Sequence, residues 1–424
     1  MINNLSERDR QVLWHPYTQM QTHGTALPIT SGKGACLYAA DGRTYLDAIS
    51  SWWVNLHGHA HPYIAEKIYA QCKELEHVIF AGFTHKPAIE LAERLLCLLP
   101  ALQKKVFYSD NGSTAVEVAL KMCIQFWHNL EKPRTKILAF KNSYHGDTFG
   151  AMSVSSRSVW TSPFEQFIFD VQFLDIPHKN NIDSLLEEIS MVHAESACFI
   201  YEPLIQGAGG MNMYEARYLD DIMHVCRDLG ILLIQDEVFT GFGRTGKLFA
   251  SNYLKEQPDI MCFSKGLTGG TLPLGITSCS DEIYNAFLSD TATKTLFHGH
   301  SFTANPLACT AALASLDLLL HEQTQKDIQR ICFLHQRFKL DVEQHPNVRE
   351  VRLQGTVIAI EWETKEDTHY FNRLRERLYG YFLDKGILMR PLGNIVYLVP
   401  PYCMSDDELF YIYESIKKAL DELI

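Results

Sequence analysis

The middle of the chain alternates short, almost wholly apolar segments with longer segments of helical periodicity. The apolar segments lie at residues 105–108, 135–140, 197–201, 231–238 and 259–263. Because each is apolar along nearly its whole length, the strands that they predict are buried on both faces. Such strands alternating with helices are typical of a mostly parallel sheet covered by helices, and therefore of an α/β fold. In such sheets the ligand crevice lies beyond the carboxyl ends of the strands.

The two ends of the chain follow a different pattern. Residues 309–338 predict one long helix, and mixed strands and helices follow, ending in a helical segment at 407–423. Near the start, residues 35–48 predict a β-hairpin. We therefore expect a large domain and a smaller α+β domain to which both termini contribute. The predicted division is into an N-terminal part of the small domain, the large domain and a C-terminal part of the small domain, at residues 1–50, 51–310 and 311–424.

Composition narrows the class of protein. The formal net charge is −12 and no run of Lys and Arg is present, which argues against a nucleic-acid partner. No segment is long and apolar enough to span a membrane, and the first residues do not form a secretory signal, so no membrane association is expected. The 11 cysteines are scattered without a C-x-x-C pair, as is typical of reduced cysteines in a cytoplasmic protein.

Candidate functional residues gather where the predicted strands end. Asp236 closes one strand, Lys265 follows another, and Tyr144 lies in a loop after a third. Gly112 and Ser113 open a helix after a fourth strand, where backbone N–H groups predict an anion site. A simple helix cap and simple aromatic packing are the ordinary alternatives at these last positions. We expect an acid, an amine, a phosphate cradle and an aromatic ring to converge on one crevice.

Lys265 has the most unusual setting of these residues. An ammonium group at a buried strand end loses hydration, which lowers its pKa and frees a nucleophilic amine. A lysine in such a place more often buries its stem and extends its head into water. The small residues around it, Ser264, Gly266, Gly269 and Gly270, leave room for a flat group bonded to the amine.

Asp236 suggests what that flat group is. A carboxylate at the end of an apolar strand is costly to bury without a cationic partner. Pyridoxal phosphate, bonded to a lysine, offers a protonated ring nitrogen as that partner. An ion pair with an Arg or Lys is the ordinary alternative for Asp236 alone, so the hypothesis depends on Asp236 and Lys265 together.

Three longer motifs resemble the class III aminotransferases of fold type I, which use pyridoxal phosphate. They are "DEVFTGFGRTGKLFA" at 236–250, "PDIMCFSKGLTGGTLPLG" at 258–275 and "HGHSFTANPLACTAALASL" at 298–316. Three others are similar to the branch of this family that acts on 8-amino-7-oxononanoate in biotin biosynthesis. These are "WHPYTQM" at 14–20, "SSWWVNLHGHAHP" at 50–62 and "RPLGNIVYLVPP" at 390–401. The resemblance covers essentially the whole chain and implies a seven-stranded sheet in the large domain.

The resemblance also implies a role for each motif residue. Lys265 attaches the cofactor and moves protons, Asp236 pairs with the ring nitrogen, and Tyr144 stacks on the ring and faces the substrate. Gly112 and Ser113 cradle the phosphate.

Residues 299–301 complete the phosphate site from the other subunit of a homodimer, according to the same resemblance. Gly299 also faces the substrate there. His300 and Ser301 stand where the family usually has Pro and Thr, so the hydroxyl survives while the backbone is less constrained.

The substrate side follows the same resemblance. Arg390 binds the carboxylate of 8-amino-7-oxononanoate, and Trp52, Trp53 and Tyr17 wall a slot for its methylene chain. Tyr17 is also a catalytic candidate. The resemblance favours S-adenosylmethionine as the amino donor, with lysine as the alternative. Another ω-amino-acid transaminase is the nearest competing function.

Two motifs suggest unrelated chemistry. "GFGRTGK" at 241–247 fits a nucleotide-binding loop, but Leu248 stands where a P-loop needs Ser or Thr. We interpret it as an active-site loop in which Arg244 supports the site. "HGHAHP" at 57–62 suggests zinc, but no carboxylate or cysteine lies at ligand spacing, so no metal is expected.

Overall fold

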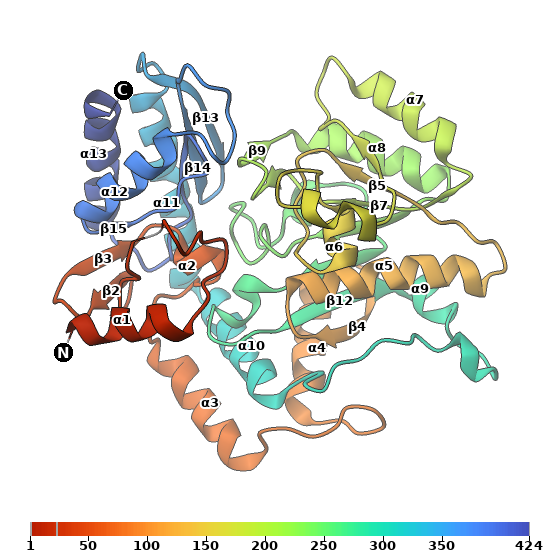
Figure 1. The fold of residues 1–424 in the computed structure, drawn as a ribbon. Coiled ribbons are helices and arrows are strands. Elements are labelled where there is room, and N and C mark those ends of the chain that lie inside the picture. The colour runs from red at the N-terminus through yellow and green to blue at the C-terminus, as the bar shows by residue number, and fades with distance from the viewer. Residues whose placement is uncertain (1, 23, 424) are drawn as a thin grey trace.

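The computed structural model of the protein describes residues 2–22 and 24–423, with side chains from residue 5 onward. Its centre is a seven-stranded sheet covered by helices, as predicted (Figure 1). Its strands in spatial order are β4 (Gln103–Ser109), β12 (Gly275–Ser280), β11 (Ile260–Phe263), β10 (Leu232–Asp236), β7 (Ser196–Tyr201), β5 (Lys136–Phe140) and β6 (Gln172–Leu174). Strand β12 runs in the opposite direction to the other six strands. The predicted α/β fold, a mostly parallel seven-stranded sheet covered by helices, is therefore confirmed.

The two faces of the sheet are covered by different helices, and alternation along β5 shows how. Ile137 and Ala139 pack with α5 (Gly112–Asn129), whereas Leu138 and Phe140 pack with α7 (Ile182–Val192) and α8 (Ala216–Asp228). Since successive side chains of a strand point to opposite faces, a strand that is apolar throughout needs a helix on each side. Helix α8 ends at Asp228, and Gly230 follows with φ +68°, a left-handed conformation typical of a residue just past a helix end.

Strand β12 was not predicted from the sequence. Its residues, "GITSCS", carry hydroxyl and thiol groups and yet are all buried. The hydroxyls are satisfied, because Ser278 donates to Gln103 Oε1 at 2.7 Å and Thr277 donates to the carbonyl of Ala115 at 2.8 Å. A strand whose polar groups find partners inside the protein has no apolar pattern by which to recognise it.

The two ends of the chain meet in one sheet, as expected. Strands β1 (Ile29–Lys33), β2 (Cys36–Ala39) and β3 (Thr44–Asp47) pair antiparallel, and β15 (Ile387–Leu388) pairs parallel with β3. The predicted hairpin at 35–48 is therefore confirmed. A second, antiparallel sheet consists of β13 (Val348–Gln354), β14 (Val357–Trp362) and β16 (Ile395–Leu398). Helices α12 (Leu374–Asp384) and α13 (Asp406–Glu422) complete this region. The domain borders at residues 50 and 310 stay a prediction.

The predicted single helix over 309–338 is wrong. The structure has α10 (Pro306–Leu319) and α11 (Glu322–Val342), which are separated by Leu320 and His321. His321 Nδ1 accepts the N–H of Gln323 at 3.2 Å and caps α11. The physical reason for the break is packing: α10 lies against α3 (Pro62–Glu74) and α4 (Lys86–Leu98), whereas α11 lies against β13 and β14.

The remaining elements are short or peripheral. They are α1 (Ile2–Val12), α2 (Ser50–Trp53), α6 (Phe149–Val154), α9 (Asp281–Asn285), β8 (Ile205–Gln206), β9 (Asn212–Met213) and 3₁₀ turns at Ser162–Phe167, Ala250–Tyr253, Lys265–Thr268 and Ala292–Lys294.

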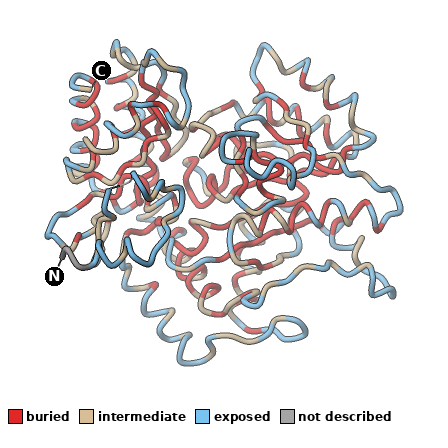
Figure 2. Tube along the Cα trace, viewed as in Figure 1, coloured by how far each residue is buried: buried red, intermediate tan, exposed pale blue. Residues whose placement is uncertain are grey.

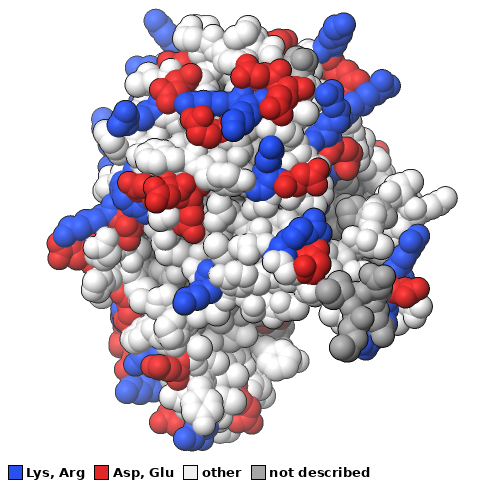
Figure 3. All heavy atoms as spheres, turned by 90° about the vertical axis from the view of Figure 1, so that its left-hand side faces the viewer, with Lys and Arg blue, Asp and Glu red and all other residues white. Residues whose placement is uncertain are grey.

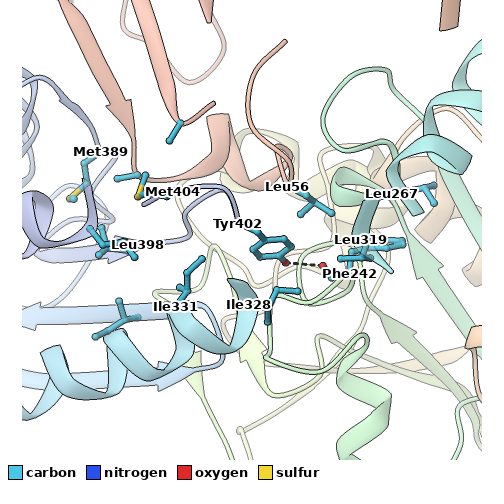
Figure 4. Packing of buried hydrophobic residues seen from close by; sticks show 14 of the residues in the cluster. Leu56, Phe242, Leu267, Leu319, Ile328, Ile331, Met389, Leu398, Tyr402 and Met404 are labelled. Atoms are coloured by element: carbon cyan, nitrogen blue, oxygen red, sulfur yellow. Dashed lines mark hydrogen bonds between the residues drawn. The ribbon is translucent and has the colours of Figure 1, made fainter. Parts of the chain in front are cut away.

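One apolar core runs from the large sheet into the C-terminal region, as the buried segments in Figure 2 indicate. Tyr402 lies in this core, and its hydroxyl donates to the carbonyl of Phe242 at 2.7 Å (Figure 4). Ile328 and Ile331 of α11 join the same cluster as Leu56. The C-terminal region is therefore packed continuously against the part that carries the strand ends.

The surface carries charges of both signs, and the cysteines are not bonded to one another. On the face shown in Figure 3, Lys and Arg side chains are interspersed with Asp and Glu side chains. Within residues 2–22 and 24–423, no helix is long and apolar enough to cross a membrane. All eleven cysteines are free thiols.

Candidate active site

A cavity of about 600 Å³ opens at the carboxyl ends of the parallel strands. Loops after three of the strands contribute to its wall: Gly112 and Ser113 after β4, Tyr144 after β5 and Glu202 after β7. The remaining walls carry Asp236 at the end of β10 and Lys265 after β11. The acid, the amine, the helix start and the aromatic residue predicted to converge do lie around one cavity.

Lys265 is half-buried and starts the 3₁₀ turn Lys265–Thr268 with φ +37°. Its Nζ lies 4.8 Å from the ring centroid of Trp53 and 5.8 Å from that of Phe239. Burial lowers the pKa of Lys265, while the carboxyl groups of Asp236 and Glu202 oppose that shift. The unprotonated amine, which is the nucleophilic form, therefore forms at a lower pH than in an exposed lysine.

Asp236 is 4% exposed and is held by a histidine that the sequence analysis did not single out. Its Oδ2 accepts the Nδ1–H of His145 at 2.7 Å, and its Oδ1 accepts the N–H of Val238 at 3.0 Å. The His145 side chain is fully buried, and its Nε2 has no partner among the described residues. The signal for His145 was its place directly after Tyr144 in a strand-end loop.

Glu202 is a second buried acid that the sequence analysis missed. Its two oxygens accept the N–H groups of Tyr144 and Gly207, each at 2.9 Å. Burial raises the pKa of Glu202 to about 7, with Asp236 adding to the shift and His145 opposing it. Glu202 fixes the loop that carries Tyr144, and its position at the end of an apolar strand was the signal that could have identified it.

The start of α5 is shaped as an open cradle. The side chain of Asn111 accepts the N–H of Thr114 at 3.0 Å, and Thr114 Oγ1 accepts the N–H of Asn111 at 3.0 Å. The amides of the first turn have no intrahelical acceptor and point outward. A Cβ atom at Gly112 would lie 2.8 Å from Val238 Cγ1, so a larger residue would crowd the cradle.

Tyr17 links this cavity to the other substrate-side residues. Its hydroxyl donates to Asp147 and lies 3.4 Å from the hydroxyl of Tyr144. Its ring meets Trp52 edge-on at 5.8 Å, and the guanidinium carbon of Arg390 lies 4.6 Å from the Trp52 ring centroid. Burial raises the pKa of Tyr17 to about 12, and the hydrogen bond to Asp147 adds to this.

The two adjacent tryptophans have different positions because the backbone that carries them is left-handed. Ser50, Ser51, Trp52 and Trp53 have φ values of 50°, 45°, 75° and 73°. Left-handed conformation costs a non-glycine residue about 1–2 kcal/mol. As a result Trp53 is 4% exposed and lines the cavity, whereas Trp52 is 38% exposed and faces Tyr17 and Arg390.

Asp47 and Arg244 hold that left-handed turn. Asp47 accepts the N–H of Ser51 at 2.9 Å and its hydroxyl at 2.7 Å. Arg244 is buried and donates to the carbonyls of Pro400 at 2.8 Å, Asn55 at 3.2 Å and Trp53 at 3.4 Å. Arg244 therefore supports the site through the backbone of the turn.

Gly299, His300 and Ser301 do not line the cavity of their own chain. His300 Nδ1 instead lies 3.2 Å from Asp110, one residue before the cradle. The family resemblance predicts that these three residues act on the site of a second subunit, and that role stays a prediction.

The two other motifs have structural explanations. In the glycine-rich loop, Gly243 donates to the carbonyl of Leu248 at 3.0 Å and Lys247 donates to the carbonyl of Asn252 at 2.9 Å. In "HGHAHP", His59 Nε2 lies 2.8 Å from Asp47 Oδ2. Across the described chain, no group of three His, Cys, Asp or Glu side chains is placed to hold a metal ion.

Comparison with known proteins agrees with this geometry. A family model described as aminotransferase class III matches residues 17–420. The chain is 48% identical to the adenosylmethionine-8-amino-7-oxononanoate aminotransferase of Synechococcus elongatus, over 97% of this chain and 99% of that protein. It is 37% identical to the protein of the same name from Staphylococcus aureus, over 99% and 98%.

Solved structures of similar fold include aminotransferases of this kind. The crystal structure of adenosylmethionine-8-amino-7-oxononanoate aminotransferase from Methanocaldococcus jannaschii superposes with a TM-score of 0.95 at 38% identity, covering 99% of both chains. The ω-transaminase of Pseudomonas jessenii, solved in complex with PMP, has a TM-score of 0.92 at 27% identity, covering 99% and 98%.

Proposed function

This chain belongs to the class III aminotransferases, and on that premise we propose that it transfers an amino group to 8-amino-7-oxononanoate. The product is 7,8-diaminononanoate, the amino donor is S-adenosylmethionine, and the step belongs to biotin biosynthesis. The relatives with this name match the chain over nearly its whole length. The cofactor is pyridoxal phosphate, and the enzyme acts as a cytoplasmic homodimer.

The residues around the cavity fit this cofactor. The cavity combines an amine of lowered pKa, Lys265, with a buried carboxylate, Asp236, and the open helix start at Gly112. The absence of a Cβ at Gly112 leaves the phosphate room beside Val238. When bound, the cofactor supplies an electron-poor ring that stabilises negative charge on the carbon next to the transferred nitrogen.

Four residues of the chain would hold the cofactor. Lys265 bonds to it, Asp236 pairs with the ring nitrogen, and the amides and hydroxyl of Gly112 and Ser113 bind the phosphate. His145 donates to Asp236 and fixes the direction in which that carboxylate points. Tyr144 lies at the wall, where its ring can stack, and Glu202 fixes its backbone.

Lys265 also moves the proton of the reaction. Its free amine would accept a proton from the substrate carbon that carries the amino group and would later return a proton from the same Nζ. Its lowered pKa makes the unprotonated, basic form of the amine more available than in an exposed lysine. The aromatic walls of Trp53 and Phe239 keep bulk water from its Nζ.

One observation supports this substrate above all: Arg390, Trp52 and Tyr17 form a continuous row of contacts that ends at Tyr144 on the cavity wall. Within the described chain, Arg390 has no acidic partner, so its guanidinium is free for a substrate carboxylate. The aromatic rings in this row provide an apolar path for a methylene chain between that carboxylate and the reacting carbon.

A homodimer is supported by the apolar surface near residues 299–301. Phe297 and Phe302 are exposed, and so are Ile79 and Phe83 in the segment beside them. The ring of Phe302 lies 5.2 Å from that of His77, which joins the two segments. Exposed apolar side chains gathered in this way are typical of a subunit interface. Ser301 then reaches the phosphate bound by the partner subunit.

The test separates the two half-reactions. Purified protein is expected to absorb near the visible edge when the cofactor is bonded to Lys265, and this band is lost in Lys265→Ala together with at least about a thousandfold of activity. Bleaching of the band by S-adenosylmethionine, compared with lysine, identifies the donor. Recovery of the band with 8-amino-7-oxononanoate but not with 2-oxoglutarate supports the proposal.

The reverse pattern of acceptors would instead favour an ω-amino-acid transaminase. That alternative is supported by the superposition with ω-transaminases of solved structure. A protein that transfers no amino group to either acceptor would refute both.

A further inference from the structure

The segment that carries Gly299 is tied to the cradle region by a chain of four polar side chains. Lys121 Nζ lies 3.3 Å from His298 Nδ1, and His298 Nε2 lies 2.8 Å from His300 Nε2. His300 Nδ1 in turn lies 3.2 Å from Asp110 Oδ2. We call this set, Lys121, His298, His300 and Asp110, the histidine relay.

The two ends of the relay fix the direction of every hydrogen bond in it. An ammonium can only donate, so His298 Nδ1 accepts from Lys121 and the proton of His298 sits on Nε2. His298 Nε2 then donates to His300 Nε2, which places the proton of His300 on Nδ1. That Nδ1–H donates to the carboxylate of Asp110, which can only accept.

The relay is complete only when both imidazoles are neutral. A second proton on His300 would place two N–H groups against each other over the 2.8 Å between the rings. A second proton on His298 would point at the ammonium of Lys121. The first change replaces the hydrogen bond between the rings by a repulsion, which the stronger attraction of the charged His300 to Asp110 opposes. The second sets like charges side by side.

The charged groups that face the relay come from two elements. Helix α5 contributes Lys121 and Glu117, and the end of β4 contributes Asp110. The pKa of His298 is lowered, first by burial and then by Lys121 and His300, while Glu117 and Asp110 act in the opposite direction. On the far side of the segment, His85 donates to the carbonyl of Ala304 at 2.7 Å and His77 packs on Phe302.

The relay joins two parts of the cofactor site. Asp110 precedes Asn111 and Gly112, which line the cavity, and its N–H is bonded to Thr114 Oγ1 at 3.2 Å. Ser301 follows His300 directly, is exposed, and is proposed above to reach the phosphate in a second subunit. The turn that presents it is closed by the bond from the N–H of His300 to Thr303 Oγ1 at 3.0 Å.

We propose that His298 and His300 are positioning residues for cofactor binding, which hold the segment 297–303 against α5 and β4 only while both are uncharged. This rests on the proposed function in one respect, namely that the site holds pyridoxal phosphate. Because burial lowers the pKa of His298 from its ordinary value of 6.5, the contribution of the relay to the folded state is complete above pH 6.5 and is lost as the pH falls below it. The cofactor is then bound less tightly.

The test compares cofactor affinity at two pH values. The dissociation constant of pyridoxal phosphate is measured on apoenzyme at pH 7.5 and pH 5.5 for the wild type, His300→Gln, His298→Gln and the control His128→Gln. Gln can donate and accept hydrogen bonds but takes no proton in this pH range. His128 is an exposed residue on α5, the helix that also carries Lys121. The cofactor's own titration is shared by all four proteins and cancels in the comparison.

The wild type and His128→Gln are expected to lose about fivefold more affinity between the two pH values than His300→Gln, the effect of one hydrogen bond. An equal loss in all four proteins overturns the proposal. His298→Gln gives the same comparison should His300→Gln fail to fold.

A second measurement needs neither cofactor nor activity. Hydrogen exchange of the amides at 297–303, corrected for intrinsic pH dependence, is expected to be slower at pH 7.5 than at pH 5.5 in the wild type and equal in His300→Gln. A wild type whose protection does not change overturns the relay. Failure to bind pyridoxal phosphate at pH 7.5 would instead refute the proposed function, so the two failures are distinguishable.

Discussion

The Nδ1 of His145 and the Oδ2 of Asp236 lie 2.7 Å apart in a region closed to solvent. Asp236 has only one other hydrogen-bond donor within the described residues, the N–H of Val238. The carboxylate that faces the cavity therefore depends on a single side chain for its orientation, and that side chain follows directly after Tyr144 in sequence.

Replacing His145 by Ala is expected to destabilise the protein by about 2 kcal/mol, because a buried carboxylate loses a charge-assisted hydrogen bond. Urea unfolding of the apoenzyme measures this. The matched control is His128→Ala, an exposed residue for which no comparable change is expected. Equal free energies of unfolding for the two variants would contradict the role assigned to His145.

Replacing Gly112 by Ala is expected to weaken pyridoxal phosphate binding by about tenfold or more, because the new Cβ would lie 2.8 Å from Val238 Cγ1 and push the cradle out of shape. Equilibrium titration of apoenzyme with the cofactor measures the affinity. The double variant Gly112→Ala with Val238→Ala removes the opposing methyl groups and is expected to recover most of it. No recovery would mean that the crowding lies elsewhere.

The stability of the apoenzyme is expected to contain a contribution from Glu202 that falls as the pH rises. Burial raises the pKa of Glu202 from 4.5 to about 7, so the folded state holds this proton where the unfolded state has released it. The sign follows directly: stability decreases between pH 4.5 and about 7 and is flat above, by up to about 3 kcal/mol.

Glu202→Gln is the variant that isolates this contribution. It shifts the free energy of unfolding by a constant amount but removes the slope, and denaturant unfolding at several pH values measures both. A slope that persists in the variant would assign the titration to another group.

Replacing Arg390 by Ala is expected to raise KM for 8-amino-7-oxononanoate by about a hundredfold, the loss of a bidentate carboxylate contact. The half-reaction with the amino donor should change little, since Arg390 lies beyond Trp52 from the cavity. Stopped-flow measurement of each half-reaction separates the two effects. A defect confined to the donor half-reaction would remove Arg390 from the proposed acceptor site.

The parts of the fold that sequence reasoning predicted are those in which one periodicity dominates. The strands β5, β7, β10 and β11 are apolar along their length, so their pattern has one interpretation. Strand β12 was missed because its buried hydroxyls are satisfied by internal partners. The break between α10 and α11 was missed because no Gly or Pro marks it between residues 319 and 327, and only the packing of each helix on a different layer requires a turn.

The cavity residues divide in the same way. Lys265, Asp236 and Gly112 follow strands that the sequence marks clearly, so their convergence was predictable. His145 and Glu202 bind residues that are far away in sequence. His145 lies 2.7 Å from Asp236, and Glu202 lies 2.9 Å from the backbone N–H of Tyr144. The sequence around either residue does not show these contacts. The biochemical roles assigned to these residues stay predictions until the variants are measured.

The left-handed turn at Ser50–Trp53 makes position 52 unusually open to redesign. Most substitutions of an aromatic residue at a binding surface sacrifice packing, but Trp52 holds φ at +75°, which Gly adopts freely and Asn tolerates. Replacing Trp52 by Gly would therefore relieve the backbone strain in the same step that widens the path to Arg390. An enzyme with altered substrate range could therefore start from a substitution of Trp52 alone, without a second substitution that restores its stability.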